Sequence, residues 1–175
     1  VDAFIKSDLE SKKVTERTYE KTVLNTFYDW SMADYRSVVK AELLRRKVAF
    51  AIDGPARDKA DRVMAALRAP DPDFGAIAKA ESDDEPTKQN GGDTGDIPLK
   101  TLDMSGVIAA VNKLTAGQMT ELIYGTDGYY VAKLTSKNAT SVRYQVIKVT
   151  LTEFDKRLAD VKQAGKIKEF ITVAQ

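Results

Sequence analysis

The spacing of apolar residues changes along this chain, and the change limits the folds open to it. In residues 1–52 apolar side chains recur at helical spacing. In residues 121–134 and 142–151, by contrast, the pattern is that of strands, with Gly and Asp turn signals in the first of these stretches. We therefore expect an α+β chain, with helices first and an antiparallel sheet after them.

Two polar signals predict where the early helices begin. Thr15 is placed to cap a helix whose apolar face includes Leu24 and Phe27. Ser31 is followed three residues later by Asp34, which is the spacing of a capping box. The longest helix is expected to start there.

The later elements are shorter. Asp53 or Gly54 is expected to cap the next helix, with Pro55 at its first position. We expect helices over 53–67, 74–80, 105–113 and 152–165, strands within 121–134 and over 142–151, and a closing strand or turn over 167–173.

Composition excludes several kinds of site. The net charge is +1, from 27 basic and 26 acidic residues, so no strong field would hold nucleic acid or an anionic membrane. The chain has neither cysteine nor histidine, which excludes structural disulfides, thiolate catalysis, serine–histidine pairs and most zinc sites. A chain without cysteine is compatible with an oxidising or a reducing compartment. No signal peptide is visible, and Val1 already fits a helical pattern, so we expect a trimmed piece of a longer chain.

The stretch QNGGDTGDIP, residues 89–98, is the least regular part of the sequence. It does not match a phosphate loop, because a helix precedes Gly91 and no lysine follows in register. Acidic residues crowd the region, yet the spacing of a calcium loop is absent. We expect a solvated acidic loop, no metal and no cofactor.

Two longer stretches carry a family resemblance. They resemble sequences typical of parvulin-type, PpiC-like, peptidyl-prolyl cis-trans isomerases. The two stretches are DFGAIAKAESDDEPTKQNGGDTGDI (73–97) and VNKLTAGQMTELIYGTDGYYVAKL (111–134). The matching positions, in order, are Asp73, Phe74, Ala78, Ser82, Asp84, Gly91, Gly92, Asp93, Gly95, Leu114, Gly117, Thr120, Gly128, Tyr129 and Lys133. Upstream, residues 27–48 are similar to the helical N-terminal part of SurA-like periplasmic chaperones.

The resemblance implies an architecture. It implies a SurA-like helical module over 1–52, with 151–175 packing on it, and a parvulin-like domain over 53–150 with an antiparallel sheet of the FKBP-like superfold and flanking helices. The expected anchors of the helical module are Phe27, Tyr28, Trp30, Phe154, Leu158, Ile167 and Phe170. In the family, the glycine-rich loop flanks the proline-binding groove. The residues that would shape it here are Gly91, Gly92, Asp93 and Gly95.

One strand is out of order relative to the family. Parvulins begin with a strand whose sequence is roughly V-R-A-x-H-I-L-V. In this chain a strand of similar sequence, 142–149, instead follows the segment that normally ends the domain. This arrangement resembles a circular permutation. It predicts that 142–149 pairs with 129–134, and that TSKNATS (135–141) closes the two strands as a hairpin.

The family's catalytic side chains are mostly replaced. The first histidine falls on Val146, with Gln145 adjacent, the second on Tyr130, and the acid on Asp84. In the family a phenylalanine and a methionine line the proline pocket. The phenylalanine corresponds to a position near Val107, and the methionine to a position near Asp103 or Met104. A family threonine corresponds to Gly125. The expected substrate-binding set is Met104, Val107, Met119, Gly125 and Asp127.

The resemblance implies an extracytoplasmic folding factor, periplasmic or at the cell surface. Its partners would be unfolded or proline-containing polypeptides, with no nucleic acid and with membrane contact only through a possible N-terminal anchor outside this sequence. Because Val146 offers no hydrogen-bonding group, we expect weak or residual isomerisation. The alternatives are an inactive parvulin-like chaperone and a structural surface protein.

Overall fold

A computed structural model describes residues 1–166 of the chain. The expected closing segment over 167–173, with the anchors Ile167 and Phe170, lies outside the described residues. The chain divides into a first unit, residues 1–48, and a second that begins at Ala49. The division expected from the sequence, at residue 52, stays a prediction.

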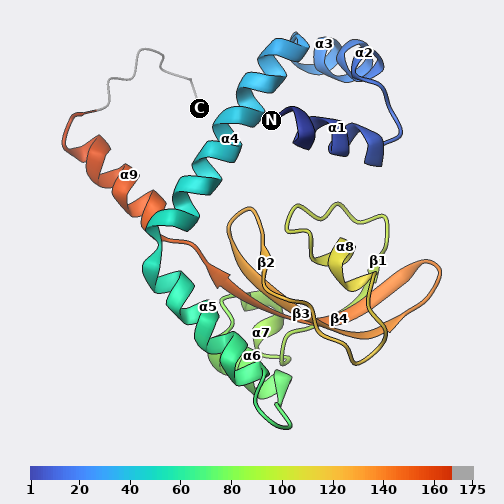
Figure 1. Ribbon diagram of the computed structural model, residues 1–175, viewed down its shortest axis with the longest axis vertical. Helices are drawn as coiled ribbons and strands as arrows, with labels where there is room; N and C mark the ends of the chain where they lie inside the picture. Colours follow the sequence, from blue (N-terminus) through green and yellow to red (C-terminus); the bar gives the residue numbers. More distant parts are fainter. Residues whose placement is uncertain (167–175) are drawn as a thin grey trace. The chain divides into compact units, whose positions relative to one another are not determined.

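The first unit is built from helices (Figure 1). They are α1 (Asp2–Ser11), α2 (Glu16–Tyr19), the π-helical turn η1 (Glu20–Leu24), α3 (Asn25–Tyr28) and most of α4 (Met32–Ile52). Both expected caps are present. The Thr15 hydroxyl accepts from the Thr18 amide at 3.2 Å, and the Asp34 carboxylate accepts from the Ser31 amide at 2.9 Å.

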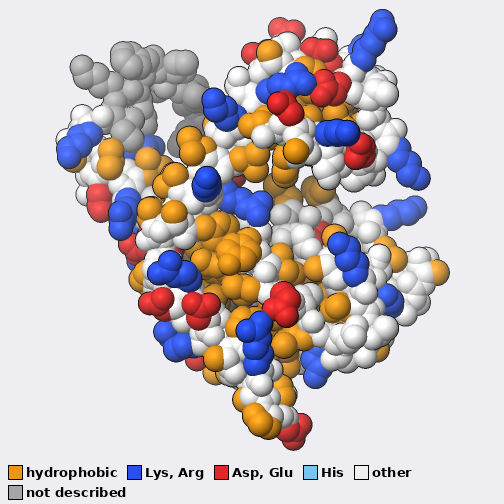
Figure 2. Space-filling view, viewed as in Figure 1, with side chains coloured by type: hydrophobic (Ala, Val, Ile, Leu, Met, Phe, Trp, Pro, Cys, Tyr) orange, Lys and Arg blue, Asp and Glu red, His pale blue; other side chains and the backbone are white. Residues whose placement is uncertain are grey.

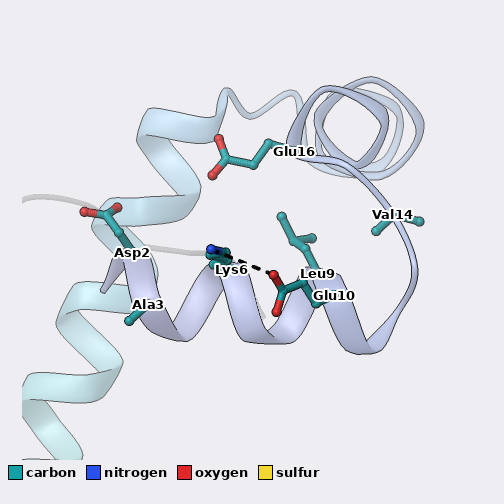
Figure 3. A pocket seen from close by; sticks show the side chains of 7 residues that line it. All are labelled: Asp2, Ala3, Lys6, Leu9, Glu10, Val14 and Glu16. Atoms are coloured by element: carbon teal, nitrogen blue, oxygen red, sulfur yellow. Dashed lines mark ion pairs between the residues drawn. The ribbon is translucent and has the colours of Figure 1, made fainter.

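A small core holds the first unit together. Its buried members are Ile5, Leu9, Leu24, Met32 and Val39, and the partly buried Trp30 packs against them. A hollow of about 350 Å³ opens beside α1 (Figure 3). Its lining mixes Leu9 and Val14 with charged side chains, and Lys6 lies 4.0 Å from Glu10.

Two of the expected aromatic anchors are not anchors. Phe27 is 72% exposed and Tyr28 is 57% exposed, although the Tyr28 ring lies 5.1 Å from that of Trp30. The cause is the π-helical turn just before them. There the Asn25 amide bonds the Glu20 carbonyl five residues back, which adds a residue to the turn and rotates the following side chains away from the core.

This difference gives a first prediction. Trp30→Ala is expected to lower the free energy of unfolding of the first unit by about 1.5–3 kcal/mol, because it removes a partly buried aromatic ring from the core. Phe27→Ala, the matched control, is expected to stay within about 0.5 kcal/mol of the wild type. Amide hydrogen exchange in α1 and α4 measures both. Equal losses of protection in the two variants would contradict this assignment.

The second unit combines helices with a sheet. Its elements after the end of α4 are α5 (Gly54–Leu67), α6 (Phe74–Glu81), α7 (Glu85–Lys88), β1 (Asp93–Pro98), α8 (Val107–Val111), β2 (Ile123–Tyr124), β3 (Gly128–Lys137), β4 (Ser141–Thr150) and α9 (Glu153–Gln163). Within the described residues the sheet has the strand order β1-β4-β3-β2, and every pairing is antiparallel. The expected α+β class is confirmed.

The displaced strand pairs as predicted. In β3 and β4, Tyr129 lies opposite Val149 and Val131 opposite Ile147, so 142–149 is a central strand beside 129–134. Strand β1 was not expected, because the sequence predicted only a loop there. Gly95 gives it little strand character, and its pairing with β4 is interrupted by a bulge between Asp93 and Asp96.

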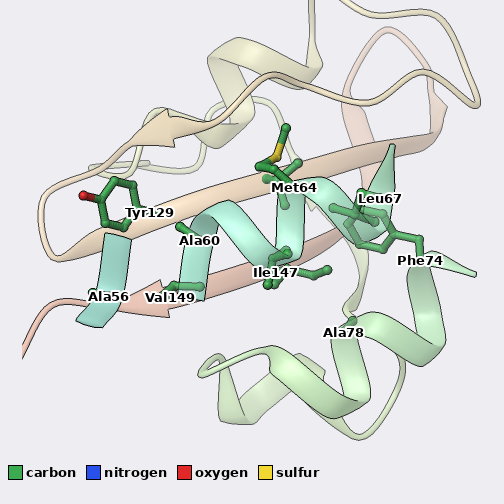
Figure 4. Close-up of a cluster of buried hydrophobic side chains, with 11 residues drawn as sticks. Ala56, Ala60, Met64, Leu67, Phe74, Ala78, Tyr129, Ile147 and Val149 are labelled. Atoms are coloured by element: carbon green, nitrogen blue, oxygen red, sulfur yellow. The ribbon is translucent and has the colours of Figure 1, made fainter. Parts of the chain in front are cut away.

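Side chains alternate between the two faces of this sheet. One face packs on α5 and α6 (Figure 4), in a cluster of Ala56, Ala60, Val63, Met64, Leu67, Phe74, Ala78, Tyr129, Val131, Ile147 and Val149. The other face packs on α8, in a cluster of Val107, Ile108, Val111, Ala132, Leu134, Val142, Tyr144 and Val146. We call this second face the α8 face. Figure 1 shows α8 on the opposite side of the sheet from α5 and α6.

A buried carboxylate joins the start of α5 to the start of α9. Asp53 is 1% exposed, and its side chain accepts from the amides of Ala56 at 3.0 Å, Thr152 at 2.6 Å and Glu153 at 3.0 Å. The expected cap of α5 is therefore Asp53, and the same side chain also caps α9. Pro55 is the second residue of α5 rather than the first.

The surface carries charges of both signs. On the face shown in Figure 2, Lys and Arg are interspersed with Asp and Glu across the described residues. In the same part of the chain, none of the helices has the length and apolar character needed to cross a bilayer.

Candidate functional site

The α8 face holds Tyr130 at its edge. Tyr130 lies on β3, and its hydroxyl donates to Asp127 Oδ1 at 2.5 Å in the turn between β2 and β3. The other Asp127 oxygen lies 2.6 Å from Lys148 Nζ on β4. Gly125 makes room for the phenol ring, because a Cβ added there would lie 2.5 Å from a ring carbon of Tyr130.

This arrangement fixes the protonation of the pair. Burial raises the pKa of Tyr130, and the hydrogen bond to Asp127 and the charges of Asp127, Asp84 and Asp103 raise it further. Burial opposes ionisation of Asp127, but hydrogen bonds from Lys148 and Tyr130 outweigh it and lower the pKa of this carboxyl. At neutral pH Tyr130 is thus a phenol bound to a carboxylate.

A second tyrosine on this face was missed in the sequence. Tyr144 on β4 is only 8% exposed, and burial raises the pKa of its phenol to about 12, with further contributions from the charges of Asp103 and Asp84. The signal was available, because Tyr144 is two residues before Val146 and strand alternation places both on one face. On this strand the family comparison drew attention to Val146 and the adjacent Gln145.

The two nearby aspartates are held by local structure. Asp84 precedes α7 and accepts from the Thr87 hydroxyl at 2.5 Å, while its amide donates to Ser82 Oγ at 3.1 Å. Ser82 Oγ also accepts from the Lys148 amide at 3.2 Å, which ties this segment to β4. Asp103 holds the start of α8, accepting from the Ile108 amide at 2.6 Å.

An apolar wall completes the α8 face. Val107 and Val146 are both buried in its cluster, and Ile123 and Tyr130 pack against it. The structure therefore brings together Tyr130, Asp127, Gly125, Val107 and Val146 from the residues that the sequence singled out. Asp84 is linked to this group through Ser82, whose hydroxyl oxygen accepts from the amides of Asp84 and Lys148.

The glycine-rich loop braces β4 from beside this wall. Gly91, Gly92 and Gly95 all have positive φ, and the Val146 amide donates to the Gly92 carbonyl at 2.9 Å. Asp93 accepts from the Gly95 amide at 3.2 Å and bonds the Arg143 guanidinium, which lowers the pKa of Asp93. The loop-shaping role expected of these positions stays a prediction.

Two of the expected site residues, Gln145 and Met119, lie away from this wall, and a third, Met104, is exposed. Gln145 donates its amide to the Gly91 carbonyl at 3.0 Å, so strand alternation turns it away from Tyr144 and Val146. Met119 lines a hollow of about 280 Å³ with Leu67, Phe74 and Lys133, on the α5 side of the sheet. Met104 is 71% exposed in the loop before α8.

The acidic residues around the glycine-rich loop are engaged individually. Asp83 pairs with Lys59 at 2.6 Å, Asp93 pairs with Arg143, and Asp103 caps α8. Among residues 1–166, no group of three or more acidic side chains is gathered in a way that could hold a metal ion. Their arrangement serves the protein's own amides and cations.

One family model matches a continuous part of this chain. Residues 51–136 match the Rotamase family, the PPIC-type PPIASE domain. Residues 51–136 are therefore similar to the parvulin-type domain that this family model describes. That match includes Asp84, the glycine-rich loop and Tyr130, whereas the central strand β4 follows it in the chain.

The chain is also similar to foldase protein PrsA from Streptococcus gordonii (strain Challis), with 27% identity over 161 residues. The similarity covers 87% of this chain but 49% of the relative, so the chain spans about half the length of the curated relative it matches. A crystal structure of foldase protein PrsA from Streptococcus pneumoniae str. Canada MDR_19A matches with a TM-score of 0.29 and 19% identity, covering 92% of this chain and 80% of that chain.

Proposed function

We propose that this chain is a protein-folding factor that binds unfolded or proline-containing segments and turns prolyl bonds weakly. The observation that carries the proposal is the placement of the Tyr130 phenol, held on Asp127 at the edge of the apolar wall of Val107 and Val146. The parvulin-type domain supports the same reaction class. The name of the streptococcal relative, foldase protein PrsA, describes a folding role for that protein.

Turning a prolyl bond requires no covalent step. The barrier is about 20 kcal/mol because the amide has partial double-bond character. A catalyst lowers it by binding the twisted amide more tightly than the planar forms. Here the apolar wall would hold the proline ring, and the phenols of Tyr130 and Tyr144 would offer hydrogen bonds to the peptide around it. The negative charge of Asp84 would raise the pKa of both phenols.

A second candidate is binding without turnover. The observation that favours it is Val146, which the resemblance sets in place of a histidine. Val146 is buried in the apolar cluster and has no side-chain group that donates or accepts a hydrogen bond. A site without that polar group would still hold a proline segment, and the chain would then act as a chaperone.

The proposed function also assigns a role to each part of the chain and a location to the protein. We infer that residues 1–52, with 151–175 packing on them, form a helical module that holds clients, and that residues 53–150 form the parvulin-like part. The exposed Phe27 and Leu44 of the helical unit support client contact, because large exposed apolar side chains favour binding. A location outside the cytoplasm belongs to the proposal and rests on the family resemblance.

The test is a pair of assays on the same samples. One measures prolyl isomerisation of a short peptide, and the other measures suppression of aggregation of an unfolded protein. The variants are Asp84→Ala with Tyr130→Ala, and Asp58→Ala on α5 as the matched control. We expect a slow wild-type rate that the double variant loses and the control keeps. A rate equal to buffer with retained suppression would favour binding without turnover. Absence of both activities would overturn the proposal and favour a structural surface protein.

A further inference from the structure

The α8 face carries more negative than positive charge. Asp127 contacts the Tyr130 hydroxyl, and the Asp84 amide shares Ser82 Oγ with the Lys148 amide of β4. Asp103 holds the start of α8, which packs on the same face, and the charges of all three aspartates raise the pKa of the Tyr130 phenol. Lys148 is the cation bound within this group, 2.6 Å from Asp127. Three carboxylates and one ammonium leave an excess of two negative charges beside the apolar wall.

Local bonds keep these carboxylates in place. Asp84 is tied to β4 through Ser82, whose hydroxyl oxygen accepts from the amides of Asp84 and Lys148. Asp103 is tied to α8, which packs on the same face as Tyr144. Three other cations of the sheet are engaged elsewhere. Arg143 pairs with Asp93, Lys137 donates to the Asn112 and Leu114 carbonyls at the end of α8, and Lys133 lines the hollow on the α5 side. The negative charge is therefore a fixed property of this site.

A buried hydroxyl gives an independent sign of a ligand. The hydrogen bonds recorded for Tyr144 within residues 1–166 use its backbone, with the carbonyl accepting from Thr94 Oγ1 at 2.9 Å, and leave its hydroxyl open. In the same part of the chain, every side-chain oxygen sealed from solvent has a partner. The Tyr144 hydroxyl, on a residue of the α8-face cluster that is only 8% exposed, therefore keeps contact with solvent and is available to a peptide group.

We propose that this site selects proline segments in which lysine or arginine flanks the proline, and that it disfavours segments in which acidic or phosphorylated residues do. The inference rests on the proposed function, because it assigns the substrate class of the same site. The apolar wall would take the proline ring, the open Tyr144 hydroxyl would bond the peptide, and the carboxylates would attract the flanking cation. An anionic neighbour would meet Asp84, Asp103 and Asp127 without a free cation to pair with.

The experiment uses three peptides that differ only in the residues flanking one proline, which are lysine, alanine or glutamate. Dissociation constants are measured for the full chain at low and at high salt. We expect the lysine peptide to bind about threefold to tenfold more tightly than the alanine peptide at low salt, with the glutamate peptide weakest, because exposed ion pairs contribute modestly and are screened. The difference is expected to shrink at high salt.

Two variants assign the preference to the site. Asp84→Asn combined with Asp127→Asn is expected to bring the lysine and alanine peptides to equal affinity. Asp58→Asn combined with Asp61→Asn, which removes the same charge from α5, is expected to leave the preference unchanged. Circular dichroism checks the fold of each variant, and amide shifts of the wild type on binding the lysine peptide provide a second localisation should the site variant unfold.

The outcomes separate this inference from the proposed function. Equal affinity for all three peptides, or tightest binding of the glutamate peptide, overturns the charge preference while the binding function stands. The inference is also overturned if the Asp84→Asn, Asp127→Asn variant still prefers the lysine peptide, or if the lysine peptide shifts only amides on the α5 side. Either result would mean that another surface attracts the lysine peptide. Failure of every peptide to bind overturns both proposals.

Discussion

Replacing Asp53 by alanine is expected to lower the free energy of unfolding of the second unit by about 2–4 kcal/mol, since helix caps contribute about 1 kcal/mol each and buried amides left without a partner cost 1–3 kcal/mol. Three amides lose their acceptor at once, one in α5 and two at the start of α9. Urea unfolding followed by circular dichroism measures the change. Asp58→Ala, an exposed acidic position on α5, is the control and should change stability by less than about 0.5 kcal/mol.

The same carboxylate predicts a pH dependence. Burial opposes ionisation of Asp53, but hydrogen bonds from the Glu153, Thr152 and Ala56 amides outweigh it, so its pKa is lowered in the folded state. A lowered folded pKa means that the stabilisation is complete above the pKa of an unfolded aspartate, about 3.9, and is lost as pH falls through the folded value. The difference in stability between wild type and Asp53→Ala should therefore be constant near neutral pH and narrow below about pH 4. A difference that does not change down to pH 2 would contradict this account.

Gly92→Ala is expected to be at least as damaging, at about 3 kcal/mol or more, because it combines a left-handed backbone with a backbone collision. Gly92 has φ +83°, and a Cβ there would lie 2.5 Å from the Val146 carbonyl oxygen and 3.0 Å from its amide nitrogen. The collision is with backbone of the central strand, which cannot rotate away as a side chain does. The variant should also disturb the α8 face, because Val146 belongs to its wall.

Gly95→Ala is the matched control for this glycine. Gly95 also has positive φ, at +64°, but a Cβ there would have no atom within 4 Å. Its loss of stability should therefore be about 1–2 kcal/mol, from the backbone conformation alone. Denaturant unfolding of both variants separates the two causes. Equal losses would show that the approach of Gly92 to Val146 has no energetic importance.

The elements that the sequence predicted well are those with local signals. Thr15 and Asp34 cap their helices as expected, because capping depends on residues two or three positions apart. The pairing of β4 with β3 was also predictable, since the short connection between them favours a hairpin. These features require little knowledge of the rest of the chain.

The elements that the sequence missed depend on distant contacts or on an irregular local turn. Strand β1 forms because β4 offers a partner, although Gly95 and Pro98 are poor strand formers. Phe27 was assigned to the core because helical spacing was assumed throughout, and the π-helical turn before it shifts the face. Strand β1 therefore depends on a tertiary contact, whereas the exposure of Phe27 follows from a local irregular turn.

The candidate site was predictable only in part. Motif positions led to Tyr130, Asp127 and Gly125, which are local to one turn. Gln145 was included because it adjoins Val146, although neighbours on a strand face opposite sides. Tyr144 and Lys148 match no motif position of the family, so a comparison by motif position did not identify them, although both lie on the strand face of Val146.

The most direct test of the central claim is to map where a proline segment binds. The full chain, labelled with ¹⁵N, is titrated with a short proline-containing peptide while amide shifts and cis–trans exchange of the peptide are recorded. We predict shifts at Tyr130, Ala132, Tyr144 and Val146 on the α8 face, together with slow catalysed exchange of the peptide. Shifts confined to Leu67, Phe74 and Met119 around the hollow on the α5 side, with no change at Tyr130 or Tyr144, would contradict the account.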